Sequence, residues 1–423
     1  MNKFYDKYGI SQKLADICNE VERESAPYMK MADEICEYNT CKVMSAFAEY
    51  RVSEEHLGTT TGYGYDDIGR DTLDKIYAKV FGAEDAIVRH NIVNGTAAIA
   101  ACLYGVLRPG DTLVAATGRP YDTLEEVIGI RGERGNGSLA DLGVSYKQVD
   151  LKDNKVDYDA LRAAIDPRVK AVEIQRSKGY AWRDSFSVDE IGEIISFVKS
   201  INKDIICIVD NCYGEFVDTK EPTEVGADLM VGSLIKNPGG GLARSGGYIA
   251  GSARCVELVS YRLTCPGIGR ECGATLGNNR SMYQGFFMAP HIVAQSIKTG
   301  IFCSALFSKL GFDVTPRFND KRSDIITSIK LESEHNLVAF CCGVQSGSPI
   351  DSFVVPAPWD MPGYEDRVIM AAGAFTQGSS IEVSADGPIR EPYIGYFQGG
   401  LTYESAKLSV MLGAQRVLAE VKK

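Results

Sequence analysis

The sequence predicts an α/β protein: a large domain with a mostly parallel sheet, followed by a smaller α+β domain. Three observations support this prediction. From about residue 73 to 255, short apolar runs alternate with helical runs, the pattern of parallel strands joined by covering helices. From about residue 300 onward that alternation is lost. The chain also has 423 residues, more than one ordinary domain contains.

The N-terminal part is expected to form a helical arm. Residues 1–58 are rich in Glu, Lys and Ala, with apolar residues at helical spacing, and such an arm could pack on a second subunit. Residues 60–72 are polar and rich in glycine, which predicts a loop. The expected domains are therefore the arm (1–58), a large domain (59–300) and a small domain (301–423).

Six apolar runs in the alternating region are predicted strands, and residues 188–199 between two of them are a predicted helix. The predicted strands are 85–89, 112–116, 146–149, 171–175, 205–209 and 229–233. In the C-terminal part, residues 336–342 and 381–384 are predicted strands, and the segment from Tyr403 is a predicted helix.

A lysine and an aspartate lie at the ends of two neighbouring predicted strands. Asp210 ends the run Ile-Ile-Cys-Ile-Val-Asp, and Lys236 follows the next run into a glycine-rich turn. In parallel sheets, ligands bind at the carboxyl ends of strands. Enzymes that use pyridoxal 5'-phosphate (PLP) need this pair, because the lysine amine bonds to the aldehyde and the carboxylate keeps the pyridine nitrogen protonated. The pattern therefore predicts a PLP site with Lys236 and Asp210 as catalytic residues.

Further residues are candidates for the phosphate end of the cofactor. Gly95 and Thr96 open an Ala-rich helical run, where free backbone N–H groups and the helix dipole favour an anion. Ser233 precedes Lys236 by three residues and Arg244 follows it by eight, a spacing used for the phosphate in aminotransferase-like PLP enzymes. Each of these residues alone could instead be a helix cap, a turn hydroxyl or a surface cation.

Tyr121 is the candidate for packing on the pyridine ring and for protonating a leaving sulfur. It follows the turn-and-strand signal Pro-Gly-Asp and the apolar run after it. The chain has 21 tyrosines, so position is the only reason to select this one.

Several motifs together resemble the Cys/Met-metabolism PLP enzymes, which include cystathionine lyases and methionine gamma-lyase. The motifs are Tyr65-Asp-Asp-Ile-Gly-Arg, Asn94-Gly-Thr, Pro109-Gly-Asp, Tyr121-Asp-Thr, Val209-Asp-Asn-Cys-Tyr and the Ser233/Lys236 segment. Glu173-Ile-Gln-Arg-Ser-Lys-Gly-Tyr, Gly378-Ser-Ser-Ile-Glu and Asp386-Gly-Pro-Ile-Arg-Glu-Pro-Tyr are more similar to the methionine gamma-lyase-like or "aluminium resistance" branch.

This resemblance implies the aminotransferase-like fold (fold type I), bound PLP, and carbon–sulfur lyase activity on a sulfur amino acid. It also implies a homodimer or homotetramer in which Tyr65 reaches the neighbouring subunit's cofactor phosphate. The sequence departs from the lyases at two positions. Asp67 stands where they carry an arginine, and Ile235 stands where they carry a hydroxyl residue before the lysine. Arg244 could replace the missing phosphate cation from within the chain.

The substrate carboxylate needs a cation, for which Arg390 is the candidate, with Arg176 and Lys178 as alternatives. The reaction is expected to be β- or γ-elimination of a thiol from cystathionine, methionine or cysteine. Amino-group transfer, or a stress-tolerance role with little turnover, remains an alternative.

Composition narrows the remaining possibilities. The net charge is −11, which disfavours nucleic acid or an anionic membrane as a partner. The N-terminus lacks the apolar core of a secretory signal, no apolar run is long enough to span a membrane, and the 12 cysteines form no Cys-x-x-Cys pair. A cytoplasmic protein without a metal site is the expectation.

Overall fold

The computed structural model describes residues 3–361 and 363–421, and it is built around a seven-stranded sheet of order β1-β9-β8-β7-β6-β2-β3. The strands are β1 (Asp85–Arg89), β2 (Thr112–Ala115), β3 (Ser145–Gln148), β6 (Val169–Gln175), β7 (Ile206–Asp210), β8 (Leu229–Ser233) and β9 (Gly247–Gly251). All pairings from β3 to β8 are parallel, and β9 runs antiparallel to both β8 and β1. The predicted α/β class and mostly parallel sheet are confirmed.

Helices cover both faces of this sheet. Side chains of successive strand residues point to opposite faces, and both faces are apolar here, so each is buried by helices. Ile208 packs with the helices α3 (Gly95–Val106), α4 (Asp122–Ile128) and α7 (Ala253–Leu263). Its neighbours Cys207 and Val209 pack on the other face with α5 (Tyr158–Ala164) and α6 (Val188–Ile201). A two-stranded ribbon, β4 (Leu151–Lys152) with β5 (Lys155–Val156), precedes α5.

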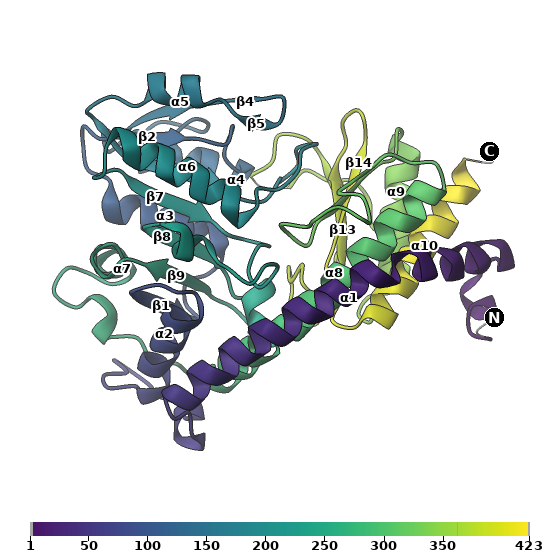
Figure 1. Cartoon of the computed structure of the whole chain (residues 1–423), viewed down its shortest axis with the longest axis horizontal. Coiled ribbons are helices and arrows are strands. Elements are labelled where there is room, and N and C mark those ends of the chain that lie inside the picture. The colour runs from purple at the N-terminus through teal and green to yellow at the C-terminus, as the bar shows by residue number, and fades with distance from the viewer. Residues whose placement is uncertain (1–2, 362, 422–423) are drawn as a thin grey trace.

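Two long helices connect the domains, as Figure 1 shows. The N-terminal helix α1 (Gln12–Glu49) lies along α8 (Asn279–Lys309) of the same chain. The boundary expected at residue 300 therefore lies within α8. The predicted loop 60–72 is shorter than expected, since α2 (Ile68–Val80) begins at Ile68 and is capped by Asp67, whose Oδ1 accepts a hydrogen bond from the Arg70 N–H at 2.8 Å.

The small domain contains a five-stranded antiparallel sheet of order β10-β11-β14-β13-β12. Its strands are β10 (Val314–Thr315), β11 (Thr327–Lys330), β12 (Val368–Ala371), β13 (Ser384–Pro388) and β14 (Ile394–Gln398). One face packs on α9 (Glu334–Ser346) and α10 (Tyr403–Glu420). Figure 1 shows β13 and β14 on the side of this domain nearer the large sheet, with α9 and α10 on the side away from it.

Two of the C-terminal predictions need correction. Residues 336–342 are not a strand but belong to α9, because Leu337, Phe340, Cys341 and Val344 bury one helical stripe against the small sheet. The strand expected at 381–384 starts only at Ser384. The glycine-rich strand β9 was not predicted. Across the described residues, no helix combines the length and the apolar content of a membrane span.

Candidate active site

The candidate site lies where three neighbouring parallel strands end. Gln175, Asp210 and Ser233 are the last residues of β6, β7 and β8, and Gln175 pairs directly with Asp210 in the sheet. Lys236 follows in the turn before a short 3-10 helix, Asn237–Gly239. These four side chains line one cavity of about 190 Å³. The sheet therefore brings together the lysine and the aspartate that the sequence predicted to act together.

One end of this cavity is suited to an anion. Gly95 and Thr96 open α3 and line the cavity, and the first N–H groups of a helix have no partner within it. The side-chain oxygen of Asn94 accepts from the Ala97 N–H at 2.8 Å, so Gly95 and Thr96 keep their N–H groups for a ligand. The buried Ser233 Oγ has no hydrogen-bond partner in the structure.

Gly95 also leaves space at this end. A Cβ atom there would approach Cys212 Sγ to 3.1 Å and Ser233 Cβ to 3.5 Å, so a side chain would fill the volume between them. The Thr96 hydroxyl is paired with the Thr123 hydroxyl at 2.7 Å. The arrangement is a cradle of backbone and hydroxyl donors, as a phosphate group requires.

Asp210 lines the cavity at the end of β7. Its Oδ1 accepts a hydrogen bond from the Cys212 N–H at 3.0 Å. Burial raises the pKa of Asp210, and the neighbouring Lys236 opposes this increase. A protonated ring nitrogen placed against Asp210 would supply the positive partner that a buried carboxylate needs.

Lys236 lies against an aromatic ring that sequence reasoning did not select. Its Nζ is 3.9 Å from the ring centroid of Tyr213, which also lines the cavity. Tyr213 adopts a positive φ of 73° within a turn that is closed by the hydrogen bond from the Gly214 N–H to the Asn211 carbonyl at 2.8 Å. The Asn211 side chain is fixed in turn, since its Oδ1 accepts from Arg176 Nη1 at 2.7 Å. The signal for Tyr213 was its place in the Asp-Asn-Cys-Tyr run at the end of β7.

Tyr121 also lines the cavity, together with a second tyrosine. Its hydroxyl lies 2.7 Å from the hydroxyl of Tyr364, a residue of the small domain that the sequence did not indicate. Burial, followed by the nearby Tyr180 and Tyr364, raises the pKa of Tyr121, so its hydroxyl is protonated at neutral pH. The pair can donate a proton to a group in the cavity.

Three predicted site residues lie outside this cavity. Arg244 is exposed and lines a separate hollow of about 620 Å³ together with Arg280 and Phe375. Arg390 is half exposed and forms an ion pair with Asp366 at 2.9 Å. Tyr65 is 56% exposed and stacks on Tyr63, with 5.5 Å between ring centroids. Their predicted roles toward phosphate and carboxylate stay predictions.

The alternatives to Arg390 are already bound within the protein. Arg176 is buried between Asn211 and Glu221, and the Nζ of the buried Lys178 donates to the Thr315 carbonyl at 3.3 Å. Among the described residues that line the cavity, Lys236 is the only basic one.

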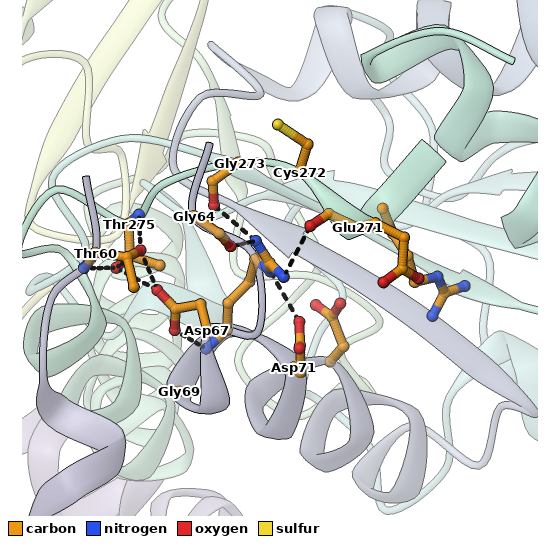
Figure 2. Close-up of polar contacts among 12 residues, drawn as sticks. Thr60, Gly64, Asp67, Gly69, Asp71, Glu271, Cys272, Gly273 and Thr275 are labelled. Carbon is orange, nitrogen blue, oxygen red and sulfur yellow. Dashed lines mark hydrogen bonds and ion pairs between the residues drawn. The ribbon is translucent and has the colours of Figure 1, made fainter. Parts of the chain in front are cut away.

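Asp67, which Figure 2 shows beside Thr60 and Thr275, and Arg70 anchor the loop that carries Tyr65. Arg70 is 1% exposed, and its Nη1 donates to the carbonyls of Gly64 at 2.6 Å and Gly273 at 3.0 Å. Asp67 accepts from the hydroxyls of Thr60 and Thr275, the latter at 2.8 Å. Asp67, at the position where the lyases carry an arginine, therefore has a structural role here. We call Asp67 and Arg70, with the hydrogen bonds that fix this loop, the clasp; the guanidinium of Arg70 is used within it and is not free for a phosphate.

The cavity residues fit PLP. The phosphate would accept hydrogen bonds from the unpartnered Ser233 hydroxyl and from the N–H groups of Gly95 and Thr96. The ring nitrogen would pair with Asp210, and the aldehyde would bond to the Lys236 amine. Tyr121 would flank the ring.

The chain is similar to several known proteins. YnbB of Bacillus subtilis (strain 168), a protein of uncharacterized function, is 54% identical over 96% of this chain and 97% of its own length. The crystal structure of a carbon-sulfur lyase involved in aluminum resistance from Clostridium novyi NT is 52% identical, covers 98% of both chains and superposes with a TM-score of 0.95. The PLP-dependent protein YhfS of Escherichia coli is 16% identical over 92% of this chain and 97% of its own, with a TM-score of 0.62, a likeness that shows the fold alone.

The predicted aminotransferase-like architecture, fold type I, is thus confirmed. The family model described as methionine gamma-lyase matches residues 14–418, nearly the whole chain. Since that match includes both domains and every residue of the cavity, the chain belongs to the methionine gamma-lyase family.

Proposed function

We propose that this protein is a PLP-dependent carbon–sulfur lyase that acts on a sulfur-containing amino acid. The observation that carries the proposal is the single cavity shared by Lys236, Asp210, Ser233 and the first residues of α3. The likeness to a carbon-sulfur lyase at 52% identity supports the same reaction class. Bound PLP supplies an electron sink, which lowers the barrier to breaking bonds at the substrate's α carbon.

Each residue of the cavity has a separate role in the proposed reaction. Gly95, Thr96 and Ser233 would hold the phosphate, and Asp210 would keep the ring nitrogen protonated. Lys236, once its amine is free, is the base that removes the proton from Cα. The Tyr121 hydroxyl, hydrogen-bonded to Tyr364, is the proton donor for the sulfur as the carbon–sulfur bond breaks. A thiol leaves, and addition of water to the remainder gives ammonia and a 2-oxo acid.

An assay of the purified holoenzyme tests the proposal. Cystathionine, methionine and cysteine are incubated separately, and thiol or sulfide, ammonia and 2-oxo acid are measured. We expect equal amounts of the three products from at least one substrate. Lys236→Ala, the control, should lose both the yellow lysine-linked absorbance and the activity, because this residue carries both functions.

The same cofactor residues would serve an aminotransferase, and the assay separates the two reactions. Conversion of the cofactor to pyridoxamine phosphate without thiol release would contradict the lyase proposal. Bound cofactor without turnover of any amino acid would favour a stress-tolerance role.

We also propose that the protein works as a homo-oligomer. Tyr63 and Tyr65 are stacked and exposed on the loop that Asp67 and Arg70 anchor. This pair is the surface that would contact a second subunit. Tyr63→Ser with Tyr65→Ser should weaken subunit association in sedimentation experiments, and an unchanged mass would contradict this proposal.

A further inference from the structure

Asp386, in the middle of β13, is a buried carboxyl group with little to stabilise it. Its side chain is 7% exposed, and its hydrogen bond from Gln398 Nε2 is long, at 3.3 Å. No lysine or arginine of the described chain forms an ion pair with it. By contrast, the buried Asp74 has Arg89 at 2.7 Å. A buried carboxylate without a cation is costly, so a carboxyl placed like Asp386 calls for a partner that the chain does not provide.

The side chain of Asp386 faces the large domain. Its neighbours Ala385 and Gly387 face α9: Ala385 belongs to the core cluster that contains Leu337, and a Cβ at Gly387 would meet Leu337 at 3.0 Å. Because strand residues alternate, Asp386 points the other way. It pairs across the sheet with Tyr396 of β14, which packs with side chains of the large domain.

Aromatic rings connect Asp386 to the cavity. Tyr396 contacts Tyr180 with 5.1 Å between ring centroids. Tyr180 in turn lies 5.9 Å from the ring of Tyr364 and 6.5 Å from that of Tyr121, both of which line the cavity. Tyrosine rings and one carboxylate are the groups that bind an organic ammonium ion, through ring faces and charge pairing.

Electrostatics agree with this placement. Burial raises the pKa of Asp386 to about 7, and the hydrogen bond from Gln398 and the charge of Lys236 oppose the increase. The tyrosines at 180, 213, 364 and 396 feel the Asp386 charge in turn, as does Cys341 on the α9 side. The charge of Asp386 is therefore felt by these four tyrosines, and Asp386 itself feels the charge of Lys236.

We propose that Asp386 and the tyrosines beside it recognise a cationic group at the far end of the substrate, an ammonium carried by the group bonded to sulfur. The preferred substrates are then amino acid thioethers whose leaving thiol bears a positive charge. This inference rests on the proposed lyase function, and it makes Asp386 a specificity-determining residue. Asp386 binds the leaving group and takes no part in breaking the carbon–sulfur bond.

Two ligands of matched size test the proposal on the holoenzyme. S-aminoethylcysteine carries an ammonium at the far end, and S-propylcysteine carries a methyl group in its place. The binding of each is followed by titrating the visible absorbance of the holoenzyme, and thiol release gives KM and kcat separately. We expect the wild-type protein to bind the cationic ligand at least about tenfold more tightly, the size of effect a charge-assisted contact provides.

Asp386→Asn should reduce this preference to about twofold or less, because it removes the charge but keeps the shape. Binding of S-propylcysteine should change little. Asp386→Glu keeps the charge and should retain much of the preference. It shows whether a loss of preference in Asp386→Asn comes from the missing charge or from poor folding. Asp313→Asn, an exposed carboxylate of the same domain, is the matched control and should leave the preference unchanged.

Equal affinity of the wild-type protein for both ligands would overturn the proposal. An equal loss of kcat on both ligands in Asp386→Asn, with a shifted pH profile, would also overturn it and make Asp386 a proton-transfer group. If the preference is present in the absorbance titration but no thiol is released from either ligand, the proposed lyase function fails and the recognition site stands.

Discussion

Replacing Ser233 by alanine should affect folding and cofactor binding in opposite directions. The Ser233 side chain is 1% exposed and its Oγ has no hydrogen-bond partner within the described chain. A buried hydroxyl without a partner destabilises the folded apoprotein, since it has given up its bond to water. If that oxygen is kept for the cofactor phosphate, its removal should relieve the apoprotein and weaken the holoenzyme.

The size of both effects follows from the chemistry of the site. An unsatisfied buried polar group costs about 1–3 kcal/mol, so the apoprotein of Ser233→Ala should gain about 1 kcal/mol in free energy of unfolding. A hydrogen bond to a charged phosphate contributes about 1.5–3 kcal/mol, so PLP affinity should fall about ten- to a hundredfold.

Urea unfolding of the apoprotein and titration with PLP measure the two effects separately. Ser296 is the matched control, because its hydroxyl on α8 is also buried and unpartnered but lies outside the cavity. Ser296→Ala should stabilise the protein similarly and leave PLP affinity unchanged. A Ser233→Ala protein that is less stable yet binds PLP normally would refute the reasoning, because Ser233 would then be a structural residue only.

Three further predictions concern other parts of the molecule. Arg70→Lys should lower the free energy of unfolding by about 3 kcal/mol, since the single nitrogen of a lysine cannot reproduce the planar fork with which Arg70 reaches Asp71 and the Gly64 and Gly273 carbonyls together, while Arg254→Lys on the surface should change it by less than about 0.5 kcal/mol in the same urea assay. Burial, with the nearby Asp210, raises the pKa of Glu173 to about 8, so the folded apoprotein holds this proton more tightly than the unfolded chain does. Stability should therefore fall as pH rises from about 5 to about 8, and fall less in Glu173→Gln; equal pH dependence of both proteins would contradict this. Arg244→Ala should reduce PLP affinity less than Ser233→Ala, because Arg244 lines a separate hollow; the reverse order in a PLP titration would restore Arg244 as the phosphate cation.

The sequence predicted the strand ends on which the candidate site is built. Buried parallel strands are short apolar runs, so the ends of β7 and β8, and with them Asp210 and Ser233, were visible without a structure. The helix start at Gly95 was visible for the same reason, because a change from strand to helical pattern marks it.

The prediction was weaker where side chains meet from distant parts of the chain. Tyr364 reaches Tyr121 across 243 positions of sequence, from a loop without a periodic pattern. The strand β9 is bounded by glycines, and the apolar residues of α9 are close enough in sequence to resemble a strand. In each case tertiary packing determined the structure of the segment or the contact, and the local sequence pattern does not contain that information.

Asp67, which stands where the lyases carry an arginine, changes how a bound PLP would be held. The clasp uses both Asp67 and Arg70 internally, so this loop has no spare charge to offer a phosphate. Under our proposal, the phosphate would be held by neutral donors of the cavity, the N–H groups of Gly95 and Thr96 and the Ser233 hydroxyl, together with the dipole of α3. Neutral donors are weaker individually than an arginine, so each one carries a larger share of the affinity. In this branch of the family, losing one hydroxyl should therefore matter more than it does where an arginine also holds the phosphate.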